Sequence, residues 1–224
     1  MTGIQRASAL MLLALSAVPA NPELAAGAQR ADDLFTRGVR LLGSSTGDPK
    51  WKALMTWTAA EMLKRSSTFA ELMDRVATAP GVLVYIEGGH ISAHGLIGRS
   101  RFEITPSGTL IGRVEIDEVD AVRPSAFDLR VRGLAHELAH AYEVICLRLP
   151  QHDTTTLRDR LAVRASIETK ESPFARAVEV EIIQDWFERP RTPSRLKALA
   201  RRHDLNACGG RDGVQLRASS SPSS

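Results

Sequence analysis

Residues 130–146 read RVRGLAHELAHAYEVIC and contain two histidines four positions apart, His136 and His140, with Glu137 directly after the first. On an α-helix, side chains four residues apart lie one turn above each other, so the two imidazoles can bind a single tetrahedral metal ion. Glu137 then lies close enough to take a proton from a water molecule at that metal. The H-E-x-x-H pattern therefore predicts a zinc site with a hydrolytic base; the alternative is an ordinary amphipathic helix whose histidines are hydrogen-bonded.

The sequence on either side of the motif predicts a long helix with two different faces. Ser125, with Asp128 three positions later, can cap its start, and Pro150 stops it after about Leu149. Apolar residues recur on the side opposite the motif, namely at Leu134, Leu138, Ala141 and Ile145. The histidines are therefore not expected to fill the core.

Helices are expected before and after a group of strands. Apolar residues at helical spacing predict helices at residues 31–42, 50–64 and 68–77, and a later helix begins with Ser172 as cap and Pro173 in first position. Between the early helices and the motif, three short stretches rich in β-branched residues predict strands, namely GVLVYIEGG, RSRFEITPSG and TLIGRVEID at residues 81–89, 99–108 and 109–117. We predict an α+β fold with a small antiparallel sheet packed on helices, in which TLIGRVEID could pair with an extended substrate.

A hydrolytic zinc site needs a third protein ligand, so that water can take the fourth position. In the longer H-E-x-x-H-x-x-G-x-x-H pattern the third ligand would stand at Cys146, but Glu143 replaces the glycine and the helix should continue. A carboxylate from the later helix is the alternative. Helix geometry favours Glu181, because Asp185 one turn later can orient a ligand histidine. Glu179 lies among apolar residues, where an unpaired carboxylate would be costly.

Several segments within residues 64–186 resemble a family of uncharacterised exported bacterial proteins built around LAHELxHAxEV. These segments are KRSSTFAELMDRV, VLVYIE, IGRSRFEI, GRVEID, LAHELAHAYEV and ESPFARAVEVEIIQDW. The resemblance places the third ligand on Glu171 and leaves Glu181 as the alternative, although the chain departs from the family at Ala139, usually glutamine, and at Glu179, usually glycine. More broadly, the motif and a downstream glutamate are similar to gluzincin-type zinc peptidases, which implies a zincin-like fold, a Zn²⁺ cofactor and peptide-bond hydrolysis.

Other classes of function stay open at this point. An exported zinc-binding or interaction protein without turnover would keep the histidines and close the metal with a fourth side chain. A binding module would instead use the sheet, or His90 and His94 in GGHISAH. Glu137 and His140 also match half of a di-iron carboxylate pattern, but no second helical E-x-x-H is present.

The two ends of the chain predict export. The apolar run ALMLLALSAVPA at residues 9–20 is too short to span a membrane but is typical of a signal-peptide core, with cleavage after Ala20 or Ala28. We expect a signal peptide at residues 1–28, one domain at 29–208 and a disordered tail at 209–224. The mature protein would then be secreted or periplasmic, without a stable membrane span. The only cysteines, Cys146 and Cys208, could form a disulfide there.

Charge and composition narrow the choice of partner. The 224 residues carry a formal net charge of +3, and no basic block is interleaved with aromatic residues. A nucleic-acid partner is therefore not indicated. A peptide or protein substrate is the expected partner, and the sequence leaves the oligomeric state open.

Overall fold

The computed structural model describes residues 22–91, 97–105, 109–118, 127–148, 172–187 and 192–205. Within these residues the chain forms six α-helices and four strands. The helices are α2 (Pro22–Phe35), α3 (Pro49–Arg65), α4 (Ser67–Ala77), α6 (Phe127–Glu143), α8 (Pro173–Phe187) and α9 (Leu196–Arg202). The strands are β1 (Val39–Leu41), β2 (Val82–Gly89), β3 (Gly98–Ile104) and β4 (Leu110–Asp117). The predicted α+β class is confirmed.

The sheet is mixed, and the prediction of an antiparallel sheet is wrong for all but one strand pair. Its order is β1-β2-β4-β3, in which β1, β2 and β4 run parallel and only β3 is antiparallel to its neighbour β4. The link between β2 and β3, residues 90–97, is longer than the tight turn of a hairpin. β2 and β3 are therefore not a hairpin, and β3 pairs with β4 on the side away from β2.

The position of β4 inside the sheet also corrects the expectation that TLIGRVEID binds an extended substrate. β4 pairs with β2 along one edge and with β3 along the other, so its backbone groups are already used. Among the described residues the edge strands are β1 and β3, and β3, with seven residues against three, has the longer unpaired edge. An added strand would pair there.

Strand β1 was not predicted, because residues 31–42 were interpreted as one helix. Helix α2 instead ends at Phe35, and residues 39–41 pair in parallel with β2, Val39 opposite Val84. Gly38 makes this change of direction possible, since a Cβ atom there would lie 2.7 Å from the carbonyl oxygen of Ala77. Its N–H donates to that same oxygen at 2.9 Å. Only a glycine lets the chain pass so close to the end of α4.

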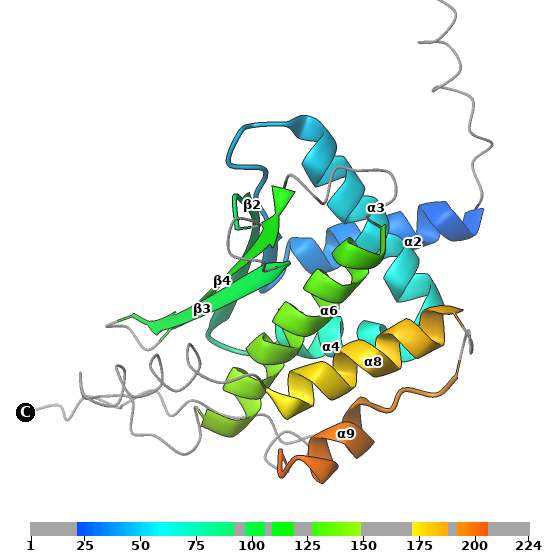
Figure 1. Ribbon diagram of the computed structural model, residues 1–224, viewed down its shortest axis with the longest axis vertical. Helices are drawn as coiled ribbons and strands as arrows, with labels where there is room; N and C mark the ends of the chain where they lie inside the picture. The colour runs from blue at the N-terminus through cyan, green and yellow to red at the C-terminus, as the bar shows by residue number, and fades with distance from the viewer. Residues whose placement is uncertain are drawn as a thin grey trace, which may run out of the picture.

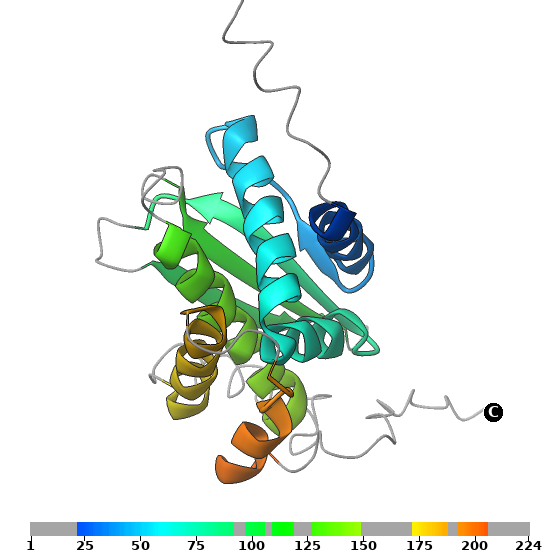
Figure 2. The same cartoon turned by 90° about the vertical axis from the view of Figure 1, so that its right-hand side faces the viewer.

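The helices cover one face of the sheet, as Figures 1 and 2 show for the described part of the chain. The strand residues alternate accordingly: every second residue of β2, beginning with Val82, is buried, and those between are only partly buried. The opposite face is occupied by charged and polar side chains such as Glu87, Arg99 and Glu115. No helix of the described residues is long and apolar enough to cross a membrane.

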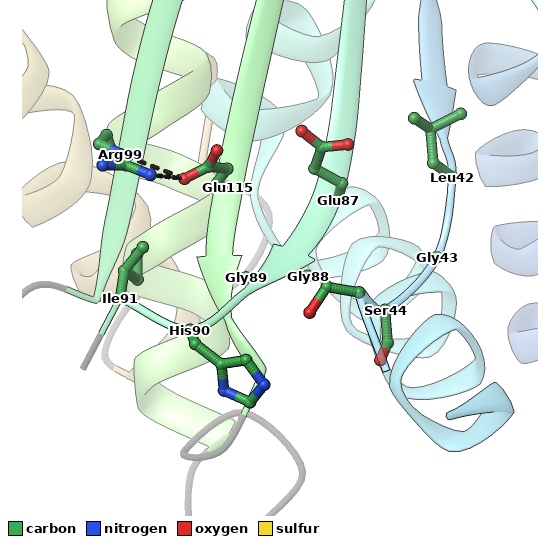
Figure 3. Close-up of a pocket in the computed structure, with 11 residues that line it drawn as sticks. Leu42, Gly43, Ser44, Glu87, Gly88, Gly89, His90, Ile91, Arg99 and Glu115 are labelled. Atoms are coloured by element: carbon green, nitrogen blue, oxygen red, sulfur yellow. Dashed lines mark hydrogen bonds and ion pairs between the residues drawn. The ribbon is translucent and has the colours of Figure 1, made fainter. Parts of the chain in front are cut away.

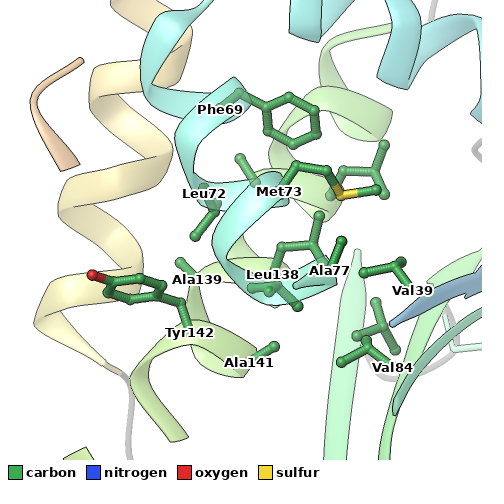
Figure 4. Close-up of a cluster of buried hydrophobic side chains, with 14 of the residues drawn as sticks. Val39, Phe69, Leu72, Met73, Ala77, Val84, Leu138, Ala139, Ala141 and Tyr142 are labelled. Carbon is green, nitrogen blue, oxygen red and sulfur yellow. The ribbon is translucent and has the colours of Figure 1, made fainter. Parts of the chain in front are cut away.

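The core between the helices and the sheet orients the motif helix. Leu138 and Ala141 of α6 are fully buried in a cluster that includes Leu72 and Met73 of α4 and Val84 of β2 (Figure 4). Burying this apolar side of α6 stabilises the fold and turns its other side toward β3 and α8. That other side carries the H-E-x-x-H motif, as the periodicity predicted.

The C-terminal end of α6 and the start of α8 match the sequence predictions closely. α6 continues into a π-helical turn at Val144–Arg148, so the helix does not bend away at Glu143. α8 begins at Pro173, and the hydroxyl of Ser172 accepts a hydrogen bond from the N–H of Ala175 at 3.1 Å. A proline in first position and a serine cap are typical of a helix start.

Candidate metal centre

The two motif histidines approach each other through their Nε2 atoms. The distance between Nε2 of His136 and Nε2 of His140 is 3.1 Å, and the ring planes are inclined at 78°. Two nitrogens bound at about 2.0–2.1 Å to one tetrahedral zinc ion lie about 3.3 Å apart. The pair could therefore accept a zinc ion with only a small rearrangement of its side chains.

The opposite nitrogens of the two rings face carboxylates. Nδ1 of His136 lies 3.1 Å from Oε2 of Glu179, and Nδ1 of His140 lies 3.8 Å from Oε2 of Glu143. An ionised carboxylate can only accept a hydrogen bond. Glu179 therefore keeps the proton of neutral His136 on Nδ1. The lone pair then stays on Nε2, on the side of the other histidine. Metal-binding histidines typically have such a partner.

Glu179 of α8, which the sequence suggests only as a disfavoured third ligand, is the side-chain partner of His136. It is buried, and both its oxygens also accept from Nη1 of Arg176 at 2.9 Å. Burial alone would raise its pKa, but the hydrogen bonds from His136 and Arg176 lower it, so the carboxylate stays ionised. The hydrogen bond to Glu179 in turn raises the pKa of His136. The signal was present, since a carboxylate among apolar residues of a helix needs a partner.

Glu137 points from α6 toward strand β3. Its side chain is buried, and burial raises the pKa of the carboxyl group above its ordinary value. The charges of His140 and His136 and a hydrogen bond from Ser100 act in the opposite direction. The motif glutamate thus lies beside both the histidine pair and the edge strand β3.

The candidates for a third ligand are not brought to the histidines within the described residues. Glu171 lies outside those residues. Glu181 and Asp185 share one face of α8, as predicted, but that face is turned toward the N-terminus of α4 and residues 192–195. Oε2 of Glu181 lies 3.4 Å from Nη1 of Arg195, and Asp185 accepts from Ser66 at 2.7 Å and from Thr192 at 2.8 Å.

Within the part of the chain that the structure describes, Asp185 therefore hydrogen bonds to Ser66, the N-cap residue of α4, and not to a histidine. The orienting role predicted for Asp185 is filled for His136 by Glu179. Among the described residues, no group of three or more His, Cys, Asp or Glu side chains is arranged to hold a metal ion. The structure thus brings two candidate ligands together, and metal binding itself and the third ligand remain predictions.

Cys146 is not available as a zinc ligand in this structure. It is fully buried and disulfide-bonded. The chain has only one other cysteine, Cys208, which lies outside the described residues. A disulfide sulfur lacks the thiolate charge that zinc requires, so the ligand arrangement with Cys146 is not supported.

His90 belongs to a different part of the molecule. It lines a hollow of about 600 Å³ on the sheet face that the helices leave uncovered, together with Glu87, Arg99 and Glu115 (Figure 3). Its Nε2 atom lies 2.8 Å from the buried carboxylate of Glu118. His94, considered with it as a possible site, lies outside the described residues. Within the described residues, His90 is therefore part of a separate cluster and not of the motif.

No protein-family model, no curated protein and no solved structure matches this chain. The assignment of a function therefore depends on the chemistry of the site.

Proposed function

We propose that the protein is a zinc-dependent peptidase of zincin-like fold, in which His136, His140 and Glu171 bind Zn²⁺ and Glu137 is the general base. The observation that carries the proposal is the orientation of the two imidazoles. Their Nε2 atoms lie 3.1 Å apart, while each Nδ1 faces a carboxylate. Glu179 keeps the lone pair of His136 on Nε2, and a metal ion would take the place of the proton that the two Nε2 atoms share.

The chemistry follows from the position of Glu137. When bound, zinc would lower the pKa of a coordinated water toward about 7 and polarise the substrate carbonyl. Glu137 accepts the proton of that water and later passes it to the leaving amine. Burial favours this role, because a carboxyl group with a raised pKa is a stronger base than an ordinary surface glutamate.

The unpaired edge of β3 supports a peptide as the substrate class. β3 lies directly beside Glu137, since its residues Gly98 and Ser100 face that side chain. An extended peptide can add to a sheet edge through main-chain hydrogen bonds. Its scissile bond would then lie within reach of the motif helix.

The disulfide at Cys146 supports the proposed secreted or periplasmic location. Disulfides persist in oxidising compartments and are rare in the cytosol. The signal peptide proposed at residues 1–28 would direct the protein there. Most of that segment lies outside the described residues.

Metal analysis followed by a peptide-library digest tests the proposed function. We expect protein purified without added metal to contain about one zinc ion per chain, because the two histidines are already aligned. Hydrolysis of library peptides should be abolished by a chelator and restored by zinc. A folded protein that ignores added zinc would refute the site. A protein that binds zinc tightly but cleaves nothing would support the non-catalytic alternative.

Replacement of Glu179 by alanine should weaken zinc binding by about 10 to 100-fold, the usual cost of losing the partner of a ligand histidine. The measurement is a competition titration with a zinc chelator at fixed pH. Glu71→Ala is the matched control, because Glu71 is a partly buried carboxylate of α4 that accepts a hydrogen bond from Ser194. Equal zinc affinity in the Glu179 variant and the wild type would show that this carboxylate does not support the metal.

A further inference from the structure

Strand β3 lies so close to Glu137 that no room is left for a side chain at position 98 of the strand. A Cβ atom built on Gly98 would lie 2.7 Å from Cγ and 2.8 Å from Oε1 of Glu137. Real Cβ atoms essentially never come this close to another heavy atom. Any residue larger than glycine at position 98 must therefore displace something.

The strand itself is held in place at this point. Gly98 is paired with Ile116 of β4, and the N–H of Asp117 donates to the carbonyl of Ile97 at 3.0 Å. Gly98 has no positive φ angle, so its backbone conformation does not require glycine. Since the strand is anchored in the sheet, the group that would yield to a methyl group is the side chain of Glu137.

Ser100 contacts the same glutamate from the same face of the strand. Residues 98 and 100 lie on one side of β3, because strand side chains alternate. The Ser100 hydroxyl donates a hydrogen bond to the Glu137 carboxylate. The side chain of Glu137 thus occupies the space that a Cβ of residue 98 would fill, and Ser100 donates to its carboxylate.

We propose that Gly98 and Ser100 are positioning residues, through which strand β3 holds the carboxylate of Glu137 beside the histidine pair. This inference rests on the proposed function for its effect on hydrolysis. It adds to that function two residues, remote from the motif in sequence, that fix the base without binding the metal.

Gly98→Ala should lower kcat by about 100-fold, since a displacement of about 1 Å at a reacting group can have an effect of this size. KM and zinc content should stay within about threefold of wild type, because neither histidine is touched. Gly89→Ala is the matched control: it lies in β2, where the nearest atom to an added Cβ is 3.6 Å away. Wild-type kcat in Gly98→Ala, or the same loss in Gly89→Ala, would overturn the proposal.

Ser100→Ala should also lower kcat, and Ser100→Thr should restore most of the loss because threonine keeps the hydroxyl. A purely structural role of Ser100 would change stability and leave the ratio of kcat values between the two variants near one. That outcome would contradict the positioning role of Ser100.

A measurement independent of hydrolysis separates this inference from the proposed function. A double-mutant cycle of Ser100→Ala and Glu137→Ala, followed by denaturant unfolding, measures the coupling of the two side chains. We expect the unfolding equilibrium constant of the double variant to differ by about threefold or more from the value that independent effects of the two substitutions would give. A crystal structure of Gly98→Ala should show the Glu137 carboxylate displaced. Independent effects together with an unmoved carboxylate would overturn the positioning role, even in a protein that hydrolyses nothing.

Discussion

Glu137→Gln is expected to lower kcat/KM for peptide hydrolysis by about 10²–10⁴-fold, the range that a general base contributes. The amide keeps the shape of the side chain but cannot accept the proton of the attacking water. The zinc content should stay at the wild-type level, because His136 and His140 are unchanged. Hydrolysis of the best library peptide and elemental analysis of the same preparation measure the two quantities.

The control for this substitution is Glu61→Gln in α3. Glu61 is also buried, and it forms an ion pair with Arg65 of the same helix at 3.3 Å. It should retain full hydrolysis, apart from any loss of folded protein. Activity of Glu137→Gln within twofold of wild type would refute the role of Glu137 as the base.

The second large effect is expected from the third ligand. Glu171→Ala should weaken zinc binding by more than about 100-fold, which exceeds the 10 to 100-fold cost of losing an outer partner. Glu181→Ala should have a small effect, because the Glu181 carboxylate is turned toward Arg195. His136→Ala provides the reference, since the loss of a motif histidine should remove zinc and hydrolysis together.

The two glutamates are ranked by titrating each variant with a zinc chelator at fixed pH. Loss of zinc from Glu181→Ala with retention in Glu171→Ala would reverse the assignment. It would then show that α8 must rearrange on metal binding, since Glu181 does not face the histidines in this structure.

Local patterns in the sequence were sufficient to predict those helices and strands that lie within one periodic segment. The pairing of His136 with His140 needs only the helical repeat, which places residues four apart on one face. Burial of Leu138 and Ala141 on the other face follows from the same repeat. α8 was predicted from its serine cap and from Pro173, because both act on the first turn alone.

The order of the strands depended on tertiary structure. The alternation within β2, β3 and β4 identifies strands, but it carries no information on which edges pair. The three residues of β1 were too few to interrupt the helical pattern around them. They become a strand because Gly38 lets the chain pass α4 and pair with β2.

The contacts that would control the chemistry also came only from the fold. Physical reasoning on the sequence indicated that a carboxylate at Glu179 needs a partner, but not that the partner is His136, which lies 43 positions earlier. Gly98 and Ser100 carry no local signal, because a glycine and a serine at the start of a strand are ordinary. Their meaning depends on the packing of β3 against α6, which brings both residues to Glu137. The two histidines of the candidate metal pair were thus set by one helical turn, whereas the contact of Glu179 with His136 and those of Gly98 and Ser100 with Glu137 were set by nonlocal packing.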